Sequence, residues 1–215
     1  MEKPVINKYF FIDFDGTITQ KDSVLAMIET FCRNGWKEIN ERWERGEIST
    51  EKCARETFDL IEASKEDLLS LADGIKIDDY FHEFLKLCIL KDYKVVILSD
   101  GYDLLIEHIL KRNGLNLPFY ANKLVIENNN FFINFPHINK NCNKCGTCKT
   151  ALLNRLKDNN SQIIYIGDGY SDICVVKEAD VVFAREPLFS YCIKNKINAN
   201  YFNDFMNIIK KLPVL

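Results

Sequence analysis

The sequence predicts a doubly wound, Rossmann-like α/β fold, in which helices cover both faces of a parallel sheet. Four short runs are rich in Val, Ile, Phe or Tyr on both faces, which is typical of buried parallel strands. Segments with helical periodicity lie between these runs, and this alternation indicates three layers. The predicted strands cover residues 9–14, 94–99, 162–166 and 180–184.

Apolar residues recur at helical spacing between the predicted strands. Residues 79–91 carry one apolar stripe, and residues 102–112 carry another that ends at Asn113-Gly114, a typical helix stop. Two further core helices are predicted over residues 150–156 and 172–178. Residues 123–127 and 131–135 are expected to form a hairpin around the asparagine-rich turn.

Residues 19–77 interrupt this alternation, because they contain helical patterns and no convincing strand. Ser64 followed by Asp67 predicts a capping box before the last of these helices. The predicted helices cover residues 22–31, 37–45, 50–61 and 67–73. We therefore expect a helical cap over residues 19–77, inserted into a core of residues 1–18 and 78–215. Its aromatic residues are expected to form the cap's own core; they are Phe31, Trp36, Trp43 and Phe58.

The 215-residue chain is 47% hydrophobic and 27% charged, as in ordinary globular proteins. Its formal net charge of −3 argues against a nucleic-acid partner. No apolar run approaches the roughly 20 residues that span a bilayer, which argues against a membrane partner. The apolar run at residues 9–14 is also too short for a signal peptide. We expect a cytoplasmic monomer or homodimer.

Acidic, hydroxyl and glycine residues follow the predicted strands, at the edge where open α/β sheets bind ligands. Asp13 and Asp15 begin on one side of the first strand, because residues two apart point the same way. Close carboxylates repel each other unless a cation neutralises them. With Asp168 from a third strand, they predict an oxygen-rich Mg²⁺ site. The other residues at these strand ends are Gly16, Thr17, Ser99, Asp100, Gly101 and Asp172.

Gly167-Asp168-Gly169 matches the start of a dinucleotide-binding fingerprint. That pattern requires glycine at its sixth position, where this chain has Asp172. The two aspartates would also repel a pyrophosphate, so the sequence argues against a dinucleotide site.

These motifs resemble the four motifs of the haloacid dehalogenase superfamily, in the same order and with similarly wide spacing. They are Asp13-Phe-Asp-Gly-Thr-Ile-Thr, Ser99 at a strand end, Lys149, and the Gly-Asp-Gly-Tyr-Ser-Asp run that ends at Asp172. The helical insert resembles the cap of the phosphoserine-phosphatase-like branch. The resemblance implies a phosphatase that acts on a small phosphorylated metabolite.

The resemblance also implies a phosphoaspartyl intermediate. Asp13 would attack phosphorus, while Asp15 would protonate the leaving oxygen and then activate water. Asp13, the backbone carbonyl of Asp15 and Asp168 would hold Mg²⁺.

Other motif residues would contact the phosphoryl group. Ser99 would donate a hydrogen bond to it, and Lys149 would balance its charge. Asp172 would orient Lys149 or support the metal. Further expected contacts come from Thr17 and from the backbone N–H groups of Asp100 and Gly101.

A finer resemblance is to bacterial 2-hydroxy-3-keto-5-methylthiopentenyl-1-phosphate phosphatases of methionine salvage. It rests on Phe135-Pro136-His137, the cysteine-bearing loop before Lys149, and the Phe183-Ala184-Arg185 strand end. The cysteine-bearing loop is also similar to that of phosphoethanolamine/phosphocholine phosphatases. Phosphoserine remains a further alternative substrate.

Cys142, Cys145 and Cys148 form two Cys-x-x-Cys spacings, with His137 upstream. These four residues are candidates for a structural Zn²⁺ site, although a loop of reduced thiols is the favoured interpretation. Two non-enzymatic alternatives are a phosphoryl-accepting receiver domain and a metal-binding module built on this loop. A receiver would not need the helical insert, and the metal-binding module leaves the acidic strand ends unexplained.

Overall fold

The computed structural model describes residues 7–128, 130–139 and 145–212. Its strands form one sheet in the order β4-β3-β2-β1-β5-β6-β7. Neighbouring strands run parallel except β3 and β4, which form an antiparallel hairpin. The strands are β1 (Lys8–Ile12), β2 (Lys94–Tyr102), β3 (Phe119–Glu127), β4 (Asn130–Asn134), β5 (Gln162–Gly167), β6 (Val181–Ala184) and β7 (Asn200–Tyr201). The predicted doubly wound α/β fold is confirmed.

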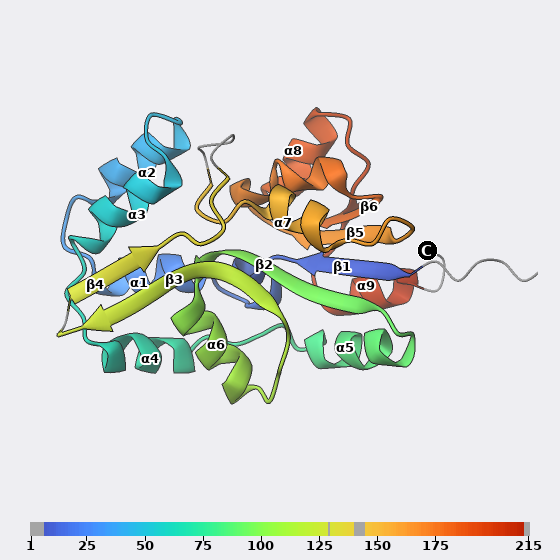
Figure 1. Ribbon diagram of the computed structural model, residues 1–215, viewed down its shortest axis with the longest axis horizontal. Coiled ribbons are helices and arrows are strands. Elements are labelled where there is room, and N and C mark those ends of the chain that lie inside the picture. The colour runs from blue at the N-terminus through green and yellow to red at the C-terminus, as the bar shows by residue number, and fades with distance from the viewer. Residues whose placement is uncertain (1–6, 129, 140–144, 213–215) are drawn as a thin grey trace, which may run out of the picture.

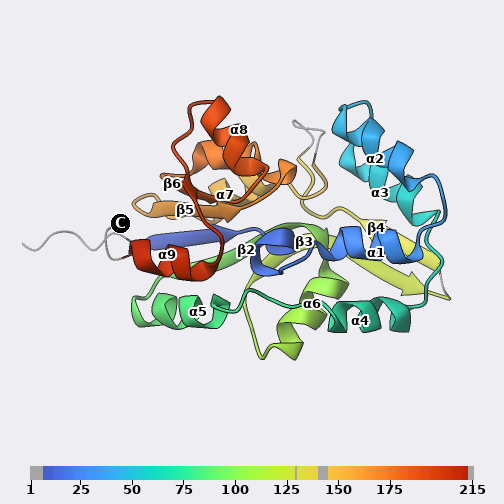
Figure 2. The ribbon, with the colours of Figure 1, turned by 180° about the vertical axis from the view of Figure 1, so that it is seen from behind.

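Helices cover both faces of this sheet (Figures 1 and 2). One face packs against α5 (Phe81–Leu90), α6 (Asp103–Arg112) and α9 (Phe205–Lys211); the other packs against α7 (Lys149–Leu156) and α8 (Leu188–Lys194). Alternate side chains of β1 therefore enter separate cores: Phe10 and Ile12 on one side, Phe11 on the other. Within the described ranges, no helix combines the length and apolar character that crossing a membrane requires.

The segment between β1 and α5 is helical. It contains α1 (Ser23–Phe31), α2 (Trp36–Glu44), α3 (Thr50–Phe58) and α4 (Lys65–Asp73). Figure 1 shows α2 and α3 above the β3–β4 end of the sheet. The predicted capping box of Ser64 and Asp67 is present at α4. Thr19 pairs with Ile77, so the chain leaves and re-enters the core at adjacent points.

Several local predictions differ from the structure. The first strand ends at Ile12, because the chain turns at Gly16, whose φ of +76° is a left-handed conformation that glycine adopts readily. The helix predicted over residues 172–178 is instead two short 3₁₀ turns, Tyr170–Asp172 and Val175–Glu178. The Asp172 carboxylate accepts hydrogen bonds from the backbone N–H groups of Asp168 and Gly169, and such side-chain contacts compete with a continuous helix. The sequence-based prediction also lacks the first part of β3 and all of α8, β7 and α9.

Candidate active site

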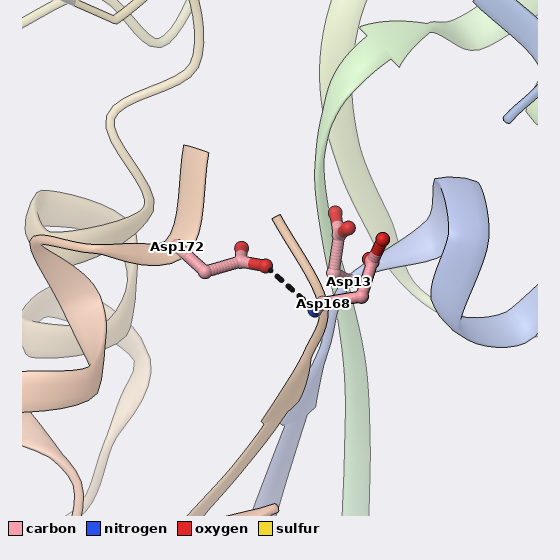
Figure 3. A group of neighbouring side chains, drawn as sticks. All are labelled: Asp13, Asp168 and Asp172. Atoms are coloured by element: carbon pink, nitrogen blue, oxygen red, sulfur yellow. Dashed lines mark hydrogen bonds between the residues drawn. The ribbon is translucent and has the colours of Figure 1, made fainter. Parts of the chain in front are cut away.

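The predicted acidic residues meet at the carboxyl ends of neighbouring strands. β1 lies between β2 and β5, so Asp13 after β1 and Asp168 after β5 leave the sheet side by side. Figure 3 shows their carboxylates pointing the same way and Asp172 opposite them, with its carboxylate directed at the backbone N–H of Asp168. Asp13 is 5% exposed and Asp172 is fully buried, so these charges act at low effective dielectric.

Lys149 is the cation of this cluster. It is the first residue of α7, and its ammonium donates to Asp13 Oδ1 at 2.6 Å, Asp172 Oδ1 at 2.6 Å and Ser171 Oγ at 2.9 Å. Burial lowers the pKa of Lys149, but attraction to the two carboxylates outweighs burial and raises it overall. Lys149 therefore remains charged with its three donors directed.

Asp172 is held on several sides. Tyr165 donates its phenol to Oδ1 at 2.5 Å, while the N–H groups of Asp168 and Gly169 donate to Oδ2 at 3.1 Å each. A Cβ at Gly167 would collide with this carboxylate, so a glycine is required there. Asp172 thus has its Oδ1 on the Lys149 ammonium, which is compatible with the predicted role of orienting that lysine.

Asp15 lies at the tight turn after β1. Its Oδ1 accepts from the Ser23 N–H at 2.7 Å, and its Oδ2 is buried without a hydrogen-bond partner. Burial, with a contribution from Asp22, raises the pKa of Asp15 to about 7. A carboxyl that is partly protonated near neutral pH is suited to proton transfer.

The residues predicted to bind phosphate are arranged differently from one another. Ser99 is buried, and its Oγ accepts from the Gly101 N–H at 2.9 Å. The Thr17 hydroxyl donates to Asp168 Oδ1 at 2.7 Å, so this side chain orients a carboxylate. The Asp100 carboxylate accepts from the Thr147 N–H at 2.7 Å and from the Asn122 side-chain amide at 3.1 Å.

The donor set at this edge fits a hard divalent cation. Carboxylate oxygens of Asp13, Asp168 and Asp172 lie within 4.8 Å of one another. Burial, followed by repulsion from Asp172, raises the pKa of Asp13 well above its usual range and that of Asp168 to about 6. Lys149 alone therefore does not neutralise the cluster. Since Asp172 is committed to Lys149 and Tyr165, Asp13 and Asp168 are the side chains best placed to hold Mg²⁺.

A cavity of about 480 Å³ opens above these residues and contains Asp13, Asp15, Ser99 and Asp168 in its wall. Its opposite wall comes from α1, α2 and α3 and is largely apolar. That wall includes Val24, Leu25, Ile28, Trp36, Trp43 and Phe58. None of the described lining residues is a lysine or arginine.

The placement of Trp36 and Trp43 differs from the prediction. Trp36 and Trp43 are half-buried and line the cavity, although their helical spacing predicts a place in the core of the cap. No residue of α2 is buried, because the helix faces the cavity with its apolar side. Phe31 and Phe58 do pack in the core, and Phe58 also reaches the cavity.

The structure gives no support to the candidate zinc site. Cys142 lies outside the described residues. His137 packs edge-on against Tyr120, with ring centroids 5.3 Å apart. Among the described residues, the cluster of Asp13, Asp168 and Asp172 is the one group of three side chains close enough to share a metal. Cys145 and Cys148 instead line a small cavity of about 160 Å³ behind Lys149.

Three residues join the site without having been assigned roles from sequence. The Ser171 hydroxyl accepts a hydrogen bond from Lys149, and the Tyr165 phenol donates one to Asp172. Arg185, at the end of β6, donates to the backbone carbonyls of Gly16 and Thr17. A signal existed for Tyr165, since it is the one hydroxyl-bearing residue within the apolar run of residues 163–166.

Comparisons with known proteins agree with this geometry. A family model described as Putative Phosphatase matches residues 9–209. A 2-hydroxy-3-keto-5-methylthiopentenyl-1-phosphate phosphatase from Bacillus thuringiensis subsp. konkukian is 31% identical over 209 residues, which is 95% of each chain.

Solved structures share the fold. A phospho-aspartyl intermediate analogue of phosphoserine phosphatase matches with a TM-score of 0.73 and 20% identity, covering 95% of this chain and 98% of that chain. A HAD family hydrolase from Salmonella enterica subsp. enterica serovar Typhi matches with a TM-score of 0.72 and 20% identity, covering 95% of this chain and 70% of that chain.

Proposed function

We propose that this chain, which belongs to the Putative Phosphatase family, is a hydrolase of the haloacid dehalogenase type that hydrolyses 2-hydroxy-3-keto-5-methylthiopentenyl-1-phosphate through an aspartyl phosphate. One observation carries the proposal. Asp13, Asp15, Ser99 and Asp168 converge from three strand ends on a single cavity whose other wall is apolar. The reactive groups and a space for a small organic tail are therefore adjacent.

In the proposed reaction, Asp13 attacks phosphorus and the bond to the leaving oxygen breaks. Asp15 transfers its proton to that oxygen and then accepts a proton from the water that hydrolyses the aspartyl phosphate. Its pKa of about 7 and its position beside Gly101 and Ser23 support this role.

Charge balance comes from the residues around Asp13. Lys149 lies 2.6 Å from Asp13 Oδ1, so its ammonium is adjacent to any phosphoryl group on that side chain. On β2, the Ser99 Oγ accepts from the Gly101 N–H, which leaves the serine O–H available to donate to a phosphoryl oxygen. Mg²⁺ held by Asp13 and Asp168, with the Asp15 carbonyl, would neutralise charge on the phosphoryl oxygens.

The cavity wall favours an apolar tail over a charged one. A substrate such as phosphoserine carries a carboxylate, whose desolvation needs a cationic partner. The described lining residues include Asp22 and Glu44 but no lysine or arginine. Trp36 and Trp43 offer polarisable faces to a methylthio group, which interacts favourably with aromatic rings.

We also propose that residues 19–77 act as a cap over the core formed by residues 1–18 and 78–215. The antiparallel pairing of Thr19 with Ile77 supports this division, because both connections between the two parts lie together. Substrate selection would then depend on α2 and α3, while the chemistry stays on the strand ends.

The test is phosphate release from the proposed substrate and from phosphoserine, each with Mg²⁺ and with EDTA. We expect kcat/KM to be about a hundredfold higher for the phosphate ester with the methylthio tail (the methylthio ester below) than for phosphoserine. A cavity wall whose described residues include no lysine or arginine disfavours the phosphoserine carboxylate. EDTA should abolish release from both. A preference for phosphoserine would contradict the proposed substrate, and EDTA-resistant release would contradict the metal-dependent mechanism.

A further inference from the structure

Arg185 joins two parts of the chain that are far apart in sequence. One amino group of its guanidinium donates to the carbonyl oxygens of Gly16 at 2.7 Å and Thr17 at 3.2 Å. The other donates to Asp78 Oδ2 at 2.9 Å. The guanidinium carbon also lies over the Phe202 ring, 4.6 Å from its centroid, which adds a cation–π contact. The arginine is thereby held by partners on three sides.

Asp78 is a fixed anchor for this arginine. Its side chain is 6% exposed, and its Oδ1 accepts from the N–H groups of Tyr80 at 3.0 Å and Phe205 at 3.3 Å. Its own N–H donates to the Ile18 carbonyl at 2.8 Å, beside the Thr19–Ile77 pairing. Asp78 therefore stands where the chain returns from the helical insert.

The other end of the contact leads directly to Asp168. Thr17 donates its hydroxyl to Asp168 Oδ1 at 2.7 Å. Gly16 packs so closely on the same carboxylate that a Cβ there would overlap it. Any shift of the Gly16–Thr17 backbone thus moves a side chain proposed to hold the metal.

We propose that Arg185 is a positioning residue. It links the Gly16–Thr17 backbone to Asp78, beside the Thr19–Ile77 pairing where the helical insert joins the core, and it thereby fixes the position of the Asp168 carboxylate. This inference rests on the proposed function, because it assumes that Asp168 serves the reaction. A planar guanidinium can donate to the carbonyls and to Asp78 together, whereas a lysine ammonium cannot match that fork. Loss of the fork leaves the loop less constrained without removing any group that touches the substrate.

The experiment compares Arg185→Lys with Arg112→Lys as a matched control. Arg112 also donates to two backbone carbonyls, those of Ala72 and Ile75, and its side chain is 28% exposed against 19% for Arg185. These two carbonyls lie in the last turn of α4 and just after it, outside the cavity. Both variants should lose a similar amount of thermal stability.

Two readouts separate positioning from structural support. Steady-state hydrolysis of p-nitrophenyl phosphate should show kcat lowered about tenfold in Arg185→Lys, with KM changed less than about threefold, because misplaced catalytic groups slow the reaction step. The rise in Tm on adding Mg²⁺ without substrate should also shrink in Arg185→Lys. Arg112→Lys should keep the wild-type kcat and the wild-type Mg²⁺ effect.

The proposal is overturned if the two variants lose equal stability and both keep the wild-type kcat and Mg²⁺ effect. Asp78→Asn provides an independent second variant, since it weakens the anchor and should reproduce the kcat loss in milder form. If the wild type hydrolyses no phosphate ester, the proposed function fails. The Mg²⁺-dependent change in Tm then still decides whether Arg185 positions Asp168.

Discussion

The strand-end cluster of Asp13, Lys149, Asp168 and Asp172 and the α2–α3 wall of the cavity differ in how firmly their side chains are held. In the cluster, Lys149 has three hydrogen-bond partners within 2.9 Å, and Asp172 is fully buried. In the wall, α2 has no buried residue, and the half-buried side chains of Trp36 and Trp43 line the cavity. Reacting groups must be held in place before substrate arrives, whereas a wall that selects a tail needs only shape and polarity. Substitutions in the two regions should therefore differ in kind.

The largest expected effect is in the cluster, at the proposed nucleophile. Asp13→Asn should lower kcat by roughly 10⁴-fold or more, because the amide cannot form the aspartyl phosphate. Phosphate release from p-nitrophenyl phosphate measures this, and circular dichroism should show an unchanged fold. Asp158→Asn is the matched control, since Asp158 accepts a hydrogen bond from Tyr9 outside the cavity. Persistence of activity in Asp13→Asn would remove the proposed mechanism.

The next effect tests whether the cluster is held by its buried cation. Lys149→Met should destabilise the protein by about 3–5 kcal/mol, because Asp13 and Asp172 would lose their buried counter-ion. Urea unfolding measures the free energy, and kcat should also fall.

Adding Asp172→Asn to Lys149→Met should recover part of this stability, because it removes one of the two uncompensated charges. A double variant as unstable as the sum of the single variants would show that the ion pair is not the source of the rigidity.

The wall should respond in substrate preference rather than in chemistry. Trp43→Ala should lower kcat/KM for the methylthio ester about tenfold, through loss of apolar contact in the cavity. Hydrolysis of glycerol phosphate, which has no apolar tail, should change little. Trp43→Phe keeps an aromatic face while losing the hydrogen bond to Thr50, and it should behave almost as wild type. An equal loss of kcat/KM for both esters would mean that Trp43 acts on the reaction step rather than on substrate choice. The wall and the strand-end cluster would then not differ in role.

The same contrast explains which residues sequence could identify. Asp13, Ser99 and Asp168 are recognisable because each follows a buried apolar run near the carboxyl end of a strand, and parallel strands end at one edge. The orientation of Trp43 depends on how α2 sits over the sheet, which local periodicity does not determine. The Arg185 motif is visible in the sequence, but the role of its side chain is not, because its partners lie 107 to 169 residues away and are mostly backbone carbonyls.

The smallest effect concerns a helix that belongs to neither region's function. The capping box at the start of α4 pairs Ser64 and Asp67, both outside the cavity. Ser64→Ala should cost about 1 kcal/mol of stability, since the N–H of Asp67 loses its partner. In a chain of this size that lowers Tm by about 3 °C, measurable by calorimetry.

Ser64→Ala should leave kcat and KM unchanged for both esters, and Ser64→Asp should restore Tm, because aspartate also caps helices. A changed KM would mean that α4 transmits its stability to the cavity through α1, against which it packs. The cavity wall would then depend on the whole insert rather than on α2 and α3 alone. Substrate selection would then involve every helix of the insert, up to the Thr19–Ile77 pairing that joins it to the core.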